Sequence, residues 1–112
     1  MTTEGRPGAN LIRADVDQLT GSVMLEFGAT WCGHCQALRP HLLQLRTEFP
    51  QVEHIWIEDG KGKPLGRSFA VKLWPTLILL RDGRVVRRLV RPTAGELEEG
   101  LKALVAEADN PL

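Results

Sequence analysis

A nearly unbroken apolar segment, Ser22–Gly28, constrains the fold of this chain more than any other feature. Its sequence is SVMLEFG. Apolar residues at almost every position are typical of a strand that is buried on both faces of a sheet. Both cysteines of the chain follow soon after, as Cys32 and Cys35. We therefore expect a central strand that ends close to a pair of thiols.

The residues after the cysteines predict a long helix, Cys32–Phe49. Apolar residues recur there at helical spacing, at Leu38, Leu42, Leu45 and Phe49. Pro40 lies inside this pattern and has no N–H to donate, so we expect a kink. Pro50 marks the end of the helix.

The rest of the chain alternates between short strands and helices. In order, we expect an edge strand Asn10–Ala14, a brief helix or turn Asp15–Thr20, strand Val52–Glu58, helix Pro64–Val71, strands Pro75–Leu80 and Arg84–Arg91, and a last helix. The turn sequence RDGR predicts that the last two strands form a hairpin. The sequence TAGE, Thr93–Glu96, is a capping box that begins the last helix. Its apolar stripe consists of Leu97, Leu101, Leu104 and Val105.

Length and charge limit the possible classes of protein. A chain of 112 residues suits one domain, which we place at residues 10–108, between tails at 1–9 and 109–112. Lys+Arg and Asp+Glu number 14 each. This balance gives no net charge that would attract nucleic acid or membranes. The first ten residues, MTTEGRPGAN, lack the features of a signal peptide, so we expect a cytoplasmic location.

The position of the cysteines favours redox chemistry. A thiol at a helix N-terminus faces unpaired N–H groups and the positive end of the helix dipole, which favour the thiolate nucleophile. We expect Cys32 to be exposed at that position. Cys35, one turn later, is placed to attack a mixed disulfide on Cys32. Gly33 permits a tight turn, and His34 can add positive charge beside the sulfur of Cys32.

Other uses of the cysteine pair remain open. A structural disulfide is one, although such bonds are rare in the cytoplasm. A zinc site needs four ligands, and beyond the cysteines the chain offers only His34, His41 and His54. We therefore expect no metal. Haem attachment requires a histidine directly after the second cysteine, where Gln36 stands.

Two motifs together resemble the thioredoxin superfamily. The motif WCGHC is similar to the active site of protein disulfide isomerase domains, and VMLEFGAT before it resembles the strand that precedes thioredoxin active sites. The sequence LWPTLILLRDGR resembles the family's segment with a cis-proline, a strand and a glycine turn. The resemblance extends over Val23–Val105. It implies a three-layer αβα sandwich with a central mixed sheet.

The resemblance also implies roles for particular residues. Cys32 would be the attacking cysteine and Cys35 the resolving one. Trp31 would shield the site, and Pro75 would be the cis-proline that faces the sulfurs. Three further residues would join Trp31 and Pro75 in contacting the bound protein. They are Gly33, Trp74 beside Pro75, and Arg91 in the loop that faces the substrate.

The chain departs from the family pattern at several positions. Glu26 stands where the family has a buried aspartate, and we expect it either to relay a proton to Cys35 or to reach water or a backbone partner near the end of the strand. His54 matches the lysine that partners this aspartate, and it either pairs with Glu26 or is an ordinary strand residue. Gly28 replaces an aromatic residue. Arg91 or Pro92 replaces a glycine.

These observations predict a thiol–disulfide oxidoreductase that acts on protein disulfides. The resemblance implies a monomer that binds no cofactor and is reset by an electron donor similar to thioredoxin reductase. A thioredoxin-like interaction module that has kept its cysteines is the alternative, and an exported oxidase or isomerase is a third. The arginines Arg84, Arg87, Arg88 and Arg91 form either a solvated edge strand or a patch for a partner.

Overall fold

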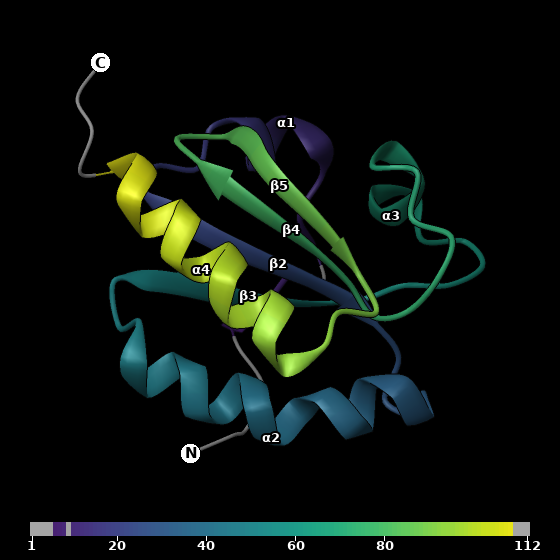
Figure 1. Ribbon diagram of the computed structural model, residues 1–112. Coiled ribbons are helices and arrows are strands. Elements are labelled where there is room, and N and C mark those ends of the chain that lie inside the picture. Colours follow the sequence, from purple (N-terminus) through teal and green to yellow (C-terminus); the bar gives the residue numbers. More distant parts are fainter. Residues whose placement is uncertain (1–5, 9, 109–112) are drawn as a thin grey trace.

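A five-stranded mixed sheet forms the middle layer of the molecule (Figure 1). The computed structural model describes residues 6–8 and 10–108. The strands are β1 (Arg6–Pro7), β2 (Ser22–Gly28), β3 (Val52–Glu58), β4 (Thr76–Arg81) and β5 (Arg84–Val90). They lie side by side in the order β1-β3-β2-β4-β5. Strand β3 is parallel to β1 and β2, whereas β4 is antiparallel to β2 and β5.

Helices cover both faces of the sheet. They are α1 (Arg13–Asp17), α2 (Gly33–Glu48), α3 (Pro64–Ser68) and α4 (Ala94–Ala108). Helices α2 and α4 lie on one face, and α1 and α3 lie on the other (Figure 1). This arrangement confirms the expected three-layer sandwich. Helix α2 runs through Pro40 without ending there.

Strand β2 is the central strand because its apolar side chains serve two cores. All seven of its residues are buried. Val23, Leu25 and Phe27 face the core under α1 and α3, and Met24 faces the core under α2 and α4. The alternation follows from the two-residue period of a strand. Glu26 shares the face of Met24, so it lies beneath α2 and α4 rather than in water.

Two local sequence signals form the structures that they predict. The turn between β4 and β5 places Asp82 and Gly83 at φ 51° and 79°, and two successive positive φ values are what a type I′ hairpin turn requires. At the start of α4, the hydroxyl of Thr93 accepts from the N–H of Glu96 at 3.1 Å. The carboxylate of Glu96 accepts from the N–H of Thr93 at 2.8 Å, which completes the capping box.

The first edge strand lies elsewhere than predicted. Asn10–Ala14 forms no strand, because Arg13 already begins helix α1. Strand β1 instead consists of Arg6 and Pro7, within the stretch 1–9 that we expected to be a tail. The N–H of Gly8 continues the pairing by donating to the carbonyl of Trp56 at 2.9 Å. Residues 1–5, 9 and 109–112 lie outside the described part of the chain.

Strand β5 is the opposite edge of the sheet and carries Arg84, Arg87 and Arg88, and Arg91 of the same cluster follows directly after it. The side chains of Arg84, Arg88 and Arg91 are exposed. Arg87 lies with Nη1 4.0 Å from a carboxylate oxygen of Glu99 on α4. Within residues 6–8 and 10–108, no helix combines the length and apolar character needed to cross a bilayer.

Candidate active site

The two cysteines lie at the start of helix α2, directly beyond the end of β2. Cys32 is the N-cap residue, and its Sγ accepts a hydrogen bond from the N–H of Cys35 at 3.2 Å. A sulfur in this position receives one of the N–H groups that a helix leaves unpaired, which favours a negative charge on it. Cys32 is only 7% exposed, so the prediction of an exposed nucleophile is wrong. Ala29 and Trp74 cover it.

Cys35 is fully buried one turn into the helix. Its exposed fraction is 0%. Burial, followed by the hydrogen bond with Cys32, raises the pKa of Cys35 from 9.0 to about 12. The raised pKa keeps Cys35 a thiol at neutral pH. The two sulfurs therefore differ in character, although both cysteines are free.

Gly28 provides the space that the sulfur of Cys35 occupies. A Cβ atom at position 28 would lie 2.6 Å from Sγ of Cys35, a distance that real Cβ atoms do not show. The same atom would lie 3.2 Å from the ring of Trp56 on β3. The indole of Trp56 thus lies directly beside Gly28. This contact was not predicted, although strand alternation places Trp56 on the same face as His54.

Glu26 and His54 form a buried pair on this face of the sheet. Nε2 of His54 lies 2.7 Å from Oε1 of Glu26, and each side chain is 2% exposed. The register pairs Met24 with His54 and Glu26 with Trp56, so the two side chains meet diagonally across β2 and β3. Of the two interpretations of Glu26, the structure therefore excludes contact with water at the end of the strand. A negative charge on Glu26 contributes to the raised pKa of Cys35.

Two tryptophans border the cysteines. The ring centroids of Trp31 and Trp74 are 5.3 Å apart, with the planes at 75°. Trp74 packs against the cluster formed by Ala29, Cys32 and Cys35, and Trp31 is 73% exposed. The indole N–H of Trp74 donates to Oδ2 of Asp59 at 2.8 Å. Asp59 was not singled out in the sequence, where it appears as an ordinary loop residue.

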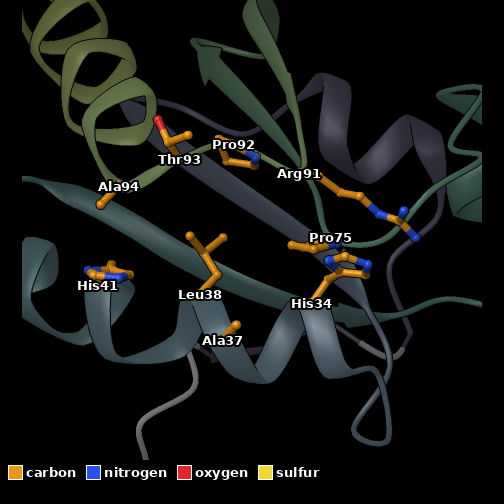
Figure 2. Close-up of a pocket in the computed structure, with 9 residues that line it drawn as sticks. All are labelled: His34, Ala37, Leu38, His41, Pro75, Arg91, Pro92, Thr93 and Ala94. Atoms are coloured by element: carbon orange, nitrogen blue, oxygen red, sulfur yellow. The ribbon is translucent and has the colours of Figure 1, made fainter.

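Pro75 and Arg91 border the site next to Trp74. The peptide bond between Trp74 and Pro75 is cis, as the resemblance implied. The N–H of Arg91 donates to the carbonyl of Pro75 at 2.9 Å, and its Nε donates to the carbonyl of Trp74 at 2.8 Å. A pocket beside Pro75 is lined by His34 and Arg91, among other residues (Figure 2). Gly33 is exposed, and a Cβ there would meet no atom within 4 Å.

The histidines and cysteines do not gather around one point. His54 is paired with Glu26, while His34 and His41 line the pocket beside Pro75. Within the part of the chain that the structure describes, no three His, Cys, Asp or Glu side chains are grouped so that they could hold a metal ion.

Comparisons with known proteins agree with this geometry. The family model described as thioredoxin matches residues 10–106. Thioredoxin Asp f 28 of Aspergillus fumigatus is 32% identical over 88 residues, which cover 78% of this chain and 82% of that protein. A mitochondrial thioredoxin-3 of Saccharomyces cerevisiae is 29% identical over 82 residues, or 73% of this chain and 65% of the relative.

Solved structures show the same likeness. Reduced thioredoxin 2 from Pseudomonas aeruginosa PAO1 superposes with a TM-score of 0.82 at 48% identity, and the match covers 95% of this chain and 99% of that one. A structure that concerns thiol resolution in yeast mitochondrial 1-Cys peroxiredoxin by glutathione and thioredoxin systems has a TM-score of 0.80 at 26% identity, over 90% of this chain and 96% of that one. The buried cysteine pair, the cis-proline beside it and the family match lead to one conclusion: the chain belongs to the thioredoxin family and is a thiol–disulfide oxidoreductase with the redox pair Cys32 and Cys35.

Proposed function

We propose that this thioredoxin-family protein reduces protein disulfides, with Cys32 as the attacking cysteine and Cys35 as the resolving one. The observation that carries this division of roles is the hydrogen bond from the N–H of Cys35 to Sγ of Cys32. It favours a thiolate on Cys32, while burial keeps Cys35 protonated. The sulfur of Cys32 can therefore attack first, while Cys35 stays a thiol until the resolving step.

The reaction follows as two exchanges. The thiolate of Cys32 attacks one sulfur of the substrate disulfide, the substrate S–S bond breaks, and the other substrate sulfur leaves as a thiolate that takes up a proton. Cys35 then loses its proton and attacks Sγ of Cys32. The second substrate thiolate leaves, and a Cys32–Cys35 disulfide forms. The substrate gains two electrons, and the enzyme loses two.

Glu26 is the group that we propose as the proton acceptor for Cys35. Glu26 is buried on the face of the sheet that α2, the helix of Cys35, covers, and it is close enough for its charge to affect the pKa of Cys35. Its hydrogen bond with His54 holds the carboxyl group in place. General base assistance of this kind typically contributes about 10²–10⁴-fold in rate.

The substrates that we propose are proteins that carry disulfides at an accessible surface. They would lie against Trp31, Gly33, Trp74, Pro75 and Arg91. The structure solved for yeast mitochondrial 1-Cys peroxiredoxin and the thioredoxin system suggests thiol peroxidases as one substrate group. We further propose that the protein acts as a cytoplasmic monomer and is reset by a flavoprotein similar to thioredoxin reductase.

The motif CGHC suggests a redox poise between two known classes. Reduction potentials are about −270 mV for thioredoxin and about −180 mV for protein disulfide isomerase. We propose that the potential of this protein lies between these values, because His34 stabilises the thiolate of the reduced form. His34→Pro then shifts the potential toward the more reducing value. A shift in the opposite direction, or none, contradicts this role of His34.

Trapping of mixed disulfides tests the proposed function. Cys35→Ser retains the attacking sulfur and lacks the resolving one, so it accumulates mixed disulfides with cellular proteins. Cys32→Ser, the matched control, accumulates far fewer. Equal capture by the two variants would refute the division of roles. If the wild-type protein does not turn over disulfides with a dithiol donor, the chain is an interaction module instead.

A further inference from the structure

The inference begins with the pocket beside the cysteines. It has a volume of about 220 Å³ and lies between helix α2 and the loop that joins β5 to α4 (Figure 2). His34 and His41 line one side, Arg91 lines the other, and Pro75 lies between them. Among the described residues, no Asp or Glu lines this pocket. Its charged and ionisable groups are therefore all basic.

Arg91 is fixed in place at this border. Its backbone has φ 48°, in the left-handed region that residues other than glycine rarely adopt. Two hydrogen bonds, to the carbonyls of Pro75 and Trp74, hold its N–H and its Nε. The Nε bond fixes the guanidinium beside the carbonyl of Trp74 and leaves the Nη donors out of that bond. In Figure 2 the side chain extends toward the same end of the pocket as His34.

The start of helix α4 adds to the positive potential. Ala94 begins this helix and lines the pocket, so the positive end of the helix dipole lies there. The nearby carboxylate of Glu96 accepts a hydrogen bond from the N–H of Thr93, and this bond lowers the pKa of Glu96. Glu96 therefore offsets part of the dipole. It does not line the pocket.

His41 contributes less than the other two basic groups. It also lines a neighbouring hollow, together with Glu48 and Glu98. These carboxylates lie on the side of His41 away from the cysteines and balance part of any charge on its ring. The strongest positive field is consequently at the end of the pocket formed by Arg91 and His34, next to the redox pair.

We propose that this pocket binds a carboxylate side chain of the substrate, so that the protein prefers disulfides that have Asp or Glu beside the attacked cysteine. The proposal rests on the reductase function given above. A carboxylate accepts two parallel hydrogen bonds from a guanidinium, which is the strongest pairing that the Nη atoms of Arg91 can make. The pocket volume also exceeds that of one water molecule, about 30 Å³, several times. It therefore has room for such a side chain.

Competition between matched peptides tests the preference at the first exchange. The Cys35→Ser protein is equilibrated in a glutathione buffer with an equal mixture of two peptides that each contain one cysteine. One peptide has Asp and the other Asn at the same position, and the pair is tested with that position one or two residues before or after the cysteine. Intact-mass spectrometry gives the ratio of the two adducts on Cys32.

Two further variants isolate the contribution of Arg91. Arg91→Gln and Arg84→Gln, each combined with Cys35→Ser, both remove one positive charge, but at different positions. Arg84 is at the other end of β5, and seven residues at about 3.3 Å each place it roughly 20 Å away. Because every variant meets the same peptides, differences between the peptides themselves cancel.

At low ionic strength, and for at least one position, we expect the Asp adduct to exceed the Asn adduct by about three- to tenfold. This excess should be the same in the Cys35→Ser protein and in its Arg84→Gln variant, since both keep Arg91. In Arg91→Gln the excess is lost. It also declines in about 1 M salt, where the screening length is about 3 Å. If the adduct ratio is the same with Arg91 and with Arg91→Gln at every position, the proposal is overturned. An equal loss of the Asp and Asn adducts in Arg91→Gln also overturns it. Failure of the wild-type protein to turn over would refute the reductase function alone, since the adduct ratio requires only Cys32.

Discussion

Nε2 of His54 and Oε1 of Glu26 lie 2.7 Å apart inside the protein, and each side chain is 2% exposed. The second ring nitrogen of His54, Nδ1, is also buried and has no hydrogen-bond partner among the described residues. A buried polar group without a partner costs free energy. The two side chains therefore depend on each other, and this dependence can be measured.

Loss of one member of the pair is expected to cost more than loss of both. His54→Leu leaves the carboxyl group of Glu26 buried without its partner, which lowers the free energy of unfolding by about 2–4 kcal/mol. In the double variant Glu26→Leu, His54→Leu, no polar group is left alone, so the loss is smaller than in His54→Leu. Urea unfolding of the wild-type protein, the single variants Glu26→Leu and His54→Leu, and the double variant measures the coupling. Additive effects of the two substitutions would contradict it.

Glu26→Gln is expected to slow the second exchange and leave the first nearly unchanged. Glutamine keeps the size and the hydrogen bonding of Glu26 but cannot accept the proton of Cys35. Resolution of a preformed mixed disulfide should slow by about 10²–10⁴-fold. Stopped-flow measurements that follow each step separately provide the test, with Glu58→Gln at the exposed end of β3 as the control. Resolution at the wild-type rate between about pH 6 and 9 would leave Glu26 a purely structural role.

The reduced protein is expected to lose stability in alkaline solution because of Cys35. Its pKa is raised from 9.0 to about 12 in the folded chain. The unfolded chain therefore releases this proton first. The stabilisation is complete below about pH 9 and is lost as the pH rises toward 12, by at most about 1.4 kcal/mol per pH unit. Urea unfolding of reduced wild-type and Cys35→Ala proteins between about pH 8 and 11 isolates this slope. If the free energies of unfolding of the two proteins change with pH in parallel, Cys35 does not cause the alkaline loss of stability.

A single methyl group at position 28 is expected to displace the resolving sulfur. In Gly28→Ala the new Cβ lies 2.6 Å from Sγ of Cys35 and 3.2 Å from the ring of Trp56. Relief of such overpacking typically costs about 1–3 kcal/mol of stability. The resolution step should slow as well, because Cys35 no longer holds its position. Gly95→Ala serves as the control, since its Cβ would meet only Oγ1 of Thr93 at 3.9 Å. Equal stability of the two variants would contradict the close contact.

Much of the architecture follows from local signals in the sequence. The apolar run of β2, the dipeptide Asp82-Gly83 and the capping box of Thr93 and Glu96 each act over a few residues, and each forms the structure that it predicts. From β2 onward, the order of strands and helices was predicted correctly for the same reason, whereas the predicted first strand, Asn10–Ala14, was wrong. Sequence alone also identified the pair Cys32 and Cys35 and its position at a helix start.

The remaining features depend on contacts between residues that are distant in the chain. A two-residue strand such as β1 has no pattern of its own, and only its pairing with β3 identifies it. Trp74, which lies in the loop before β4, packs against the cluster that contains Cys32. Arg91 borders the same site through its hydrogen bonds to Trp74 and Pro75.

The pairing of Glu26 with His54 shows most directly what the tertiary structure decided. Each residue could be assigned to a strand from sequence, but whether they meet depends on the register between β2 and β3, which places Met24 opposite His54. A shift of one residue would turn His54 to the other face of the sheet. Local patterns determine which segments become strands and helices, because those choices involve neighbouring residues. The register, and with it the environment of the cysteines, is decided only when the two cores pack on either side of β2.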